Sequence, residues 1–85
     1  MIDVKEATVK AREHLTAFFP EAENVQLEEA ELTDDKAHWL ITLSCEGVSN
    51  TVASSLLAGK SVLYKIFKLD AKTGDVLSMK IRDIK

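Results

Sequence analysis

The side chains best suited to chemistry in this sequence are one cysteine, Cys45, and two histidines, His14 and His38. A reactive thiol needs an exposed, electropositive setting, yet Cys45 ends an alternating apolar run, where a cysteine behaves as a small buried side chain. The three residues stand at unrelated spacings that match no zinc site, and the sequence has no Gly-rich phosphate loop or nucleophile elbow. We therefore expect no catalytic residue, no metal and no cofactor, and we predict that the chain is not an enzyme.

Acidic residues are concentrated in the first half of the chain. Seven acids and no base occur between Glu21 and Asp35, and the formal net charge is -3. The spacing of these acids is not that of an EF-hand calcium loop, and a negative net charge argues against nucleic-acid binding. We interpret the acids as lining an exposed strand and turn, with a charge-steered contact to a basic partner as the alternative. On the first interpretation, four basic residues balance them on the solvent face of the sheet: Lys65, Lys68, Lys80 and Arg82.

Two aromatic residues, Trp39 and Tyr64, have two possible roles. They could stack on a small ligand in a pocket between a helix and a sheet, although 85 residues leave little volume for such a pocket. More often a tryptophan in this position anchors the core beneath the helix, and we expect Trp39 to lie near Phe18 and Phe19.

Residues 46–61 form a long connection that is rich in small residues and has no charge between Glu46 and Lys60. Its apolar side chains are the candidate partner-binding residues, because exposed apolar groups on a small domain usually mark a contact surface. In the alternative, the loop folds back over the open face of the sheet and enlarges the core. Both possibilities stay open, and the candidate residues are Val52, Leu56 and Leu57.

The chain is long enough for one domain, 1–85, and it begins with a predicted helix over about residues 3–19. Asp3 and Glu6 suit the N-terminal cap of this helix, and Pro20 ends it. Apolar residues recur at steps of three or four and predict one buried stripe. They are Val4, Ala7, Ala11, Leu15 and Phe18.

Alternating apolar residues after Pro20 predict four strands, at about 25–32, 37–46, 61–70 and 75–83. The alternation slips at Glu28-Glu29, where a β-bulge would keep four apolar residues on one face, namely Val25, Leu27, Ala30 and Leu32. A frayed or curved strand is the alternative. In the last strand, Leu77, Met79 and Ile81 are expected to point inward. The resulting fold class is α+β, with one N-terminal amphipathic helix packed on a four-stranded antiparallel sheet.

Three stretches carry a resemblance to a known family: Glu6-Ala7-Thr8-Val9-Lys10-Ala11 through Leu15, Trp39-Leu40-Ile41-Thr42-Leu43, and the hairpin from Tyr64 to Leu77 with its Asp70-Ala71-Lys72-Thr73-Gly74 turn. This pattern resembles the PepSY-like domains. The resemblance implies a helix-on-sheet fold and a non-enzymatic module that inhibits or regulates a partner, with no catalytic residues to carry over.

We therefore expect a non-catalytic interaction or regulatory module that acts through loop 46–61 and the sheet face, on a protein partner or on a second copy as a homodimer. The alternatives are a small-ligand-binding domain and a homodimeric structural protein. We also expect a cytoplasmic location without membrane contact, because there is one cysteine, no signal-peptide core and no apolar run of the ~18 residues that would cross a bilayer.

Overall fold

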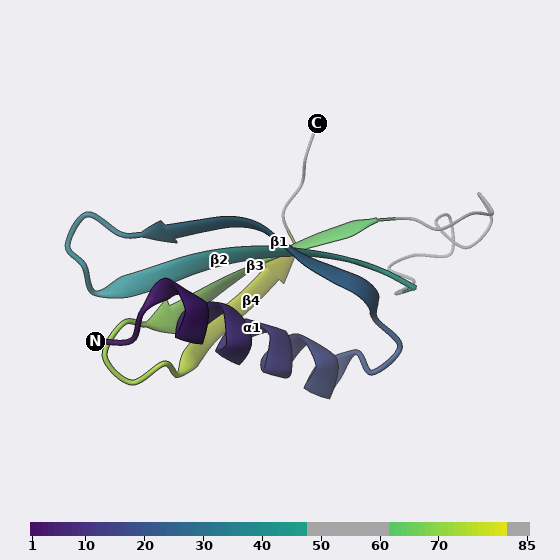
Figure 1. The fold of residues 1–85 in the computed structure, drawn as a ribbon, viewed down its shortest axis with the longest axis horizontal. Coiled ribbons are helices and arrows are strands. Elements are labelled where there is room, and N and C mark those ends of the chain that lie inside the picture. Colours follow the sequence, from purple (N-terminus) through teal and green to yellow (C-terminus); the bar gives the residue numbers. More distant parts are fainter. Residues whose placement is uncertain (48–61, 82–85) are drawn as a thin grey trace.

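The computed structural model describes residues 1–47 and 62–81. Helix α1 (Val4–Phe18) is followed by strands β1 (Glu23–Leu32), β2 (His38–Glu46), β3 (Leu63–Asp70) and β4 (Val76–Ile81). The strands form one antiparallel sheet in the order β1-β2-β3-β4, and α1 lies across one of its faces (Figure 1). The structure thus confirms the predicted α+β fold class.

The helix begins and ends where the sequence predicts. The Asp3 carboxylate accepts a 2.8 Å hydrogen bond from the backbone N–H of Glu6, and Phe19, the residue before Pro20, leaves the helical conformation. The buried stripe is shorter than predicted: Ala7, Ala11 and Leu15 are buried, but Val4 and Phe18 are exposed, Phe18 to 62%. Small alanines let the middle of α1 approach the sheet closely, and a straight helix diverges from a twisted sheet toward its ends.

The core lies between α1 and the helix-facing side of the two central strands. Its largest fully buried apolar side chains are Phe67, Leu15, Ile41, Leu43 and Leu69. β2 and β3 are paired along their whole length, with Ile41 directly opposite Phe67 and with Leu43 and Leu69 on the same face beside this pair.

Lys65 corrects one prediction, because it is 5% exposed and lies opposite Leu43 on the helix-facing side, not on the solvent face. Alternation along β3 places residue 65 on the same face as Phe67. The ammonium Nζ lies 4.8 Å from the ring centroid of Phe19, so a cation–π contact accompanies burial of the aliphatic stem.

The predicted bulge in β1 is confirmed. The register shifts between Leu27 and Glu29, and again between Glu23 and Gln26. As a result, Leu27 lies opposite Leu43 and Ala30 lies opposite Ile41, both facing α1. Leu27 nevertheless remains 45% exposed.

A bulge that the sequence did not predict changes β4. Ser78 pairs with Lys68 and Val76 pairs with Leu69, so Leu77 is an extra residue between two ladder positions. The inward prediction for Leu77 is wrong, because Val76 packs on the core and Leu77 is 54% exposed. Met79 packs on the core as expected, whereas Ile81 is exposed.

The turn between β3 and β4 has the conformation that its residues favour. The Asp70 carboxylate accepts hydrogen bonds from the N–H groups of Lys72 at 2.8 Å and Thr73 at 3.0 Å. Gly74 adopts φ +81°, which an L side chain resists. The preceding Ala71 is buried, and its carbonyl accepts a 2.8 Å hydrogen bond from the N–H of Ile2, so this turn holds the start of the chain.

Candidate functional site

The apolar residues predicted to bind a partner, Val52, Leu56 and Leu57, lie outside the described residues. The candidate site is therefore built from the remaining features of residues 1–47 and 62–81.

Cys45 occupies a buried position on the helix-facing side of β2, with 1% of its surface exposed. Burial raises the pKa of the Cys45 thiol above its usual value, while the Lys65 ammonium lowers this pKa and the Glu21 carboxylate raises it. Because the thiolate is the reactive form, this setting suppresses nucleophilic chemistry at neutral pH. The interpretation of Cys45 as a small buried side chain is confirmed.

The two histidines do not lie beside Cys45 in the structure. His14 packs on aromatic rings, with its centroid 4.8 Å from that of Phe18 and 6.1 Å from that of Phe67. His38 lies opposite Asp70 at the other end of β2. In the described part of the chain, no group of three or more His, Cys, Asp or Glu residues is placed to hold a metal ion.

Trp39 and Tyr64 lie on opposite faces of the sheet, so they do not form the ligand-stacking pair that the sequence left open as the alternative. Trp39 is opposite the core residue Leu69, whereas Tyr64 is opposite Ser44 on the face away from α1. Trp39 does pack on the core, but at the start of the helix rather than near the two phenylalanines. Its indole Nε1 donates a 3.1 Å hydrogen bond to the carbonyl of Ile2, next to the start of α1. Phe18 and Phe19 lie at the other end of this 15-residue helix, which is about 22 Å long.

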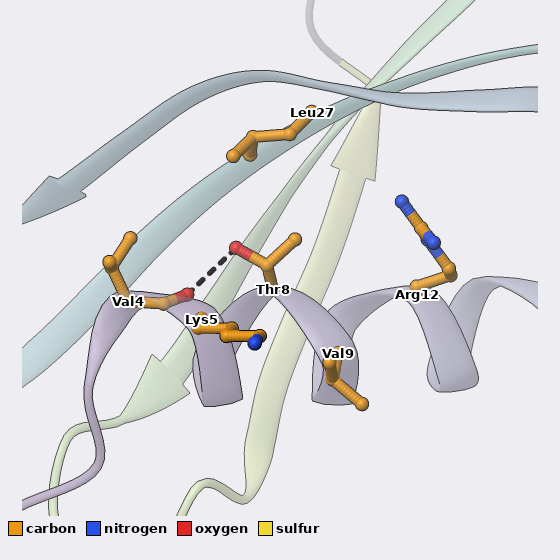
Figure 2. Close-up of a pocket in the computed structure, with 6 residues that line it drawn as sticks. All are labelled: Val4, Lys5, Thr8, Val9, Arg12 and Leu27. Carbon is orange, nitrogen blue, oxygen red and sulfur yellow. Dashed lines mark hydrogen bonds between the residues drawn. The ribbon is translucent and has the colours of Figure 1, made fainter.

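An open groove lies between α1 and β1, and Figure 2 shows the side chains that line it. Its volume is about 400 Å³. Leu27 comes from β1, while Thr8 and Arg12 extend from α1 toward the strand (Figure 2). The complete lining is Val4, Lys5, Thr8, Val9, Arg12 and Leu27.

The groove exists because α1 and β1 are held to the core at other positions. The buried alanines of α1 hold the helix against the core, and β1 contributes Val25 and Ala30 to it. Between these two residues the β1 bulge leaves Leu27 half-exposed, facing an exposed part of α1. The apolar side chains Val4 and Val9 on that part of the helix are likewise about half-exposed.

Chemically, the groove combines an apolar lining with positive charge. Val4, Val9 and Leu27 supply apolar surface, and Thr8 donates its hydroxyl to the Val4 carbonyl at 2.8 Å, inside the helix. Lys5 and Arg12, both exposed, supply two cations, and none of the six lining residues is acidic. An occupant with an apolar body and an anionic group would match both features.

Sequence reasoning missed this groove because it assigned Val4 to the buried stripe and Leu27 to the buried face of β1. The available signal was Val9, an apolar residue outside the stripe and flanked in the helix by Lys5 and Arg12. That pattern marks a second, weaker apolar surface on α1. The sequence could not show that Leu27 lies beside this surface, because the position of Leu27 depends on the β1 bulge.

A smaller and more polar pocket of about 200 Å³ lies where β1 and β2 meet the far face of β3. Two of its carboxylates already have partners: Glu28 accepts from the Ser44 hydroxyl at 2.8 Å, and Glu46 accepts from the Asn24 amide at 3.2 Å. These hydrogen bonds give the polar groups a structural role in joining β1 to β2.

Comparisons of this chain with protein-family models, with characterised proteins and with solved structures found no match. Among the described residues, α1 is too short and too polar to cross a membrane.

Proposed function

We propose that this chain is a non-catalytic protein-interaction module whose α1–β1 groove receives an apolar, acidic segment of a partner protein. One observation carries the proposal: three half-exposed apolar side chains meet two cations in one groove, without an acidic residue in the lining. Cys45, the best candidate for catalysis, is buried with a raised thiol pKa, which supports a binding role over an enzymatic one.

The apolar part of the groove supports binding. Val4 and Val9 on α1 and Leu27 on β1, which is distant in the sequence, line the same groove. Removing such surface from water is worth roughly 25 cal/mol per Å² before the costs of association, so apolar side chains inserted here would supply much of the affinity.

The charged part of the groove supports selectivity. The chain as a whole is negative, at -3, yet Lys5 and Arg12 make this groove locally positive. A carboxylate on the partner would be attracted to these side chains, and the acidic residues of β1 would discourage an acidic segment from binding elsewhere along that strand.

The resemblance to PepSY-like domains supports the same class of function, because modules of that family are non-enzymatic and regulate partners. We extend the proposal accordingly: the segment bound in the groove belongs to a protein that the module inhibits or modulates. Loop 46–61 stays a predicted second contact region, and a cytoplasmic location stays a prediction that a single buried thiol agrees with.

The test is selection of peptides from a random displayed library against the purified chain. Enriched peptides should carry leucine, valine or phenylalanine together with aspartate or glutamate. A Lys5→Glu/Arg12→Glu variant should bind them at least about tenfold more weakly, and Lys72→Glu, which makes the same kind of charge change in the β3–β4 turn, should bind normally. No enrichment, or equal binding by the groove variant, would contradict the proposal.

Small-ligand binding is a second candidate, because a volume of about 400 Å³ lies within the range of ligand pockets. The matching ligand is an apolar anion, for which decanoate is a simple probe. Decanoate, but not decylamine, should raise the melting temperature, and the rise should disappear in the Lys5→Glu/Arg12→Glu variant. A decanoate effect without peptide enrichment would favour this candidate over the protein-binding one.

A further inference from the structure

The sheet face opposite α1 presents an ordered arrangement of side chains. No described element lies over this face, since α1 is on the other side (Figure 1). The strand registers align residues into rows that run from β1 to β4. One row consists of Glu29, Thr42, Ile66 and Lys80, and the adjacent row consists of Glu31, Leu40, Lys68 and Ser78.

Charge changes sign along these rows. The β1 end of each row is a glutamate, at Glu29 and Glu31, whereas the lysines lie on the last two strands, at Lys68 and Lys80. All four of these charged side chains are exposed. The face is therefore negative along one edge of the sheet and positive toward the other.

The middle of the face is less polar. Leu40 on β2 and Ile66 on β3 are diagonal neighbours in the ladder, and both are only partly buried. Diagonal cross-strand neighbours are about 7–8 Å apart, close enough for their side chains to form one small apolar surface.

We propose that this face binds the same face of a second copy of the chain, about a two-fold axis that runs parallel to the strands. Such a rotation keeps each row at its own level and reverses the order of the strands. β1 of one copy then lies over β4 of the other, so Glu29 faces Lys80 of the second copy, twice by symmetry. Glu31 faces Ser78 of the second copy, with Lys68 of the second copy on the next strand, and the apolar centres meet.

The other two-fold arrangement is disfavoured by charge. With the axis across the strands, β1 would lie over β1, and the glutamates of the two β1 strands would face one another. Like charges in juxtaposition destabilise an interface, so the charge pattern selects the axis parallel to the strands. The selected arrangement is also compatible with the usual aligned packing of two sheets, which lie about 10 Å apart with strand directions within about 30° of each other.

The expected dimer is weak. A face of four strands about 4.8 Å apart and about six residues long covers roughly 400 Å², about half of what a standard interface buries on each side. The association should therefore depend on concentration and weaken with added salt, since exposed charge pairs are screened. The dimer uses the sheet face opposite the α1–β1 groove, so failure of the dimer proposal would not contradict the proposed function, and the reverse also holds.

Sedimentation analysis over a range of concentrations tests this proposal. The native chain should show a monomer–dimer equilibrium that shifts to monomer in high salt. Glu29→Lys alone and Lys80→Glu alone should each raise the dissociation constant by about tenfold or more. Lys72→Glu, off this face, should leave it unchanged.

Mixing provides the decisive measurement. In an equimolar mixture of Glu29→Lys and Lys80→Glu chains, each new lysine faces a new glutamate, while each remaining native glutamate faces a native lysine. The mixture should regain dimer formation, as should the Glu29→Lys/Lys80→Glu double variant, and a change within one chain could not produce the first result. Glu31→Lys and Lys68→Glu form a second pair for the same test if either of the first variants fails to fold, as judged by circular dichroism. A native chain that stays monomeric, or single variants that stay monomeric when mixed, would overturn the proposal.

Discussion

The indole Nε1 of Trp39 donates a 3.1 Å hydrogen bond to the carbonyl oxygen of Ile2, the second residue of the chain. Ile2 is buried, and its own N–H donates to the Ala71 carbonyl at 2.8 Å. A single residue before α1 is thus tied to β2 through one group and to the β3–β4 turn through another. This double attachment fixes where the helix starts relative to the sheet, and with it the position of the α1–β1 groove.

Replacing Trp39 with Phe should lower the free energy of unfolding by about 1–3 kcal/mol. The substitution removes the donor for the Ile2 carbonyl and part of the buried ring, although the phenyl ring still covers the core. Urea denaturation measures the change. Tyr64→Phe, an aromatic substitution on the opposite face, is the matched control and should cost less; equal losses would show that the hydrogen bond to Ile2 contributes nothing.

Gly74→Ala should destabilise the fold by about 1–2 kcal/mol, because Gly74 has φ +81°, where a Cβ is strained. An added Cβ would also lie 3.3 Å from Lys10 Cε, so this flexible side chain would have to shift slightly, and it would contact Ile2 Cδ1 at 3.4 Å. Gly74→Asn should cost less than Gly74→Ala, since asparagine tolerates positive φ better. Thermal denaturation of the two variants gives the comparison, and an alanine variant as stable as the native chain would contradict the strain argument.

Much of this fold follows from local signals in the sequence. The Asp3 cap, the Pro20 stop and the Asp70 turn act through hydrogen bonds and backbone restrictions within a few residues, so the helix and the last hairpin could be predicted. The bulge in β1 was also visible, because the apolar pattern itself changes phase at Glu28.

What could not be predicted depends on partners distant in the chain. Leu77 continues a regular alternation, and only its pairing with β3 shows that it is an extra residue in the ladder. Lys65 was placed by its charge, although its position in the β3 alternation already indicated the helix-facing side. The groove required both the helix position and the β1 register, neither of which has a local signal.

The stability contributed by Asp70 should depend on pH. Hydrogen bonds from the N–H groups of Thr73 and Lys72 hold the pKa of the Asp70 carboxyl below its usual value of 3.8. Because the folded state releases this proton more readily than the unfolded state, the stabilisation is present above that value and is lost as the pH falls through the folded-state pKa.

Asp70→Asn should therefore be less stable than the native chain at pH 7, and the difference should shrink well below pH 3.8. Urea denaturation at the two pH values measures it. Asp35→Asn offers a parallel case in the β1–β2 turn, where the hydroxyl of Thr33 and the N–H of Ala37 lower the pKa of the Asp35 carboxyl. A stability difference for Asp70→Asn that stays constant across this range would show that the charge on the carboxylate is not what stabilises the turn.

Cys45 should react with iodoacetamide much more slowly in the folded chain than in the unfolded chain. The thiol is 1% exposed, and burial raises its pKa, so both access and thiolate population are low at neutral pH. Labelling followed by mass spectrometry should be slow in the native state and complete in urea.

Lys65→Met offers a sharper test, because the Lys65 ammonium lowers the pKa of Cys45 while its stem fills the same side of the core. With methionine at position 65 the packing is retained and the favourable charge is lost, so the pH at which the native thiol becomes reactive should rise. An unchanged pH profile in a folded Lys65→Met variant would mean that exposure by local opening, and not the electrostatics around the sulfur, controls the reactivity of Cys45.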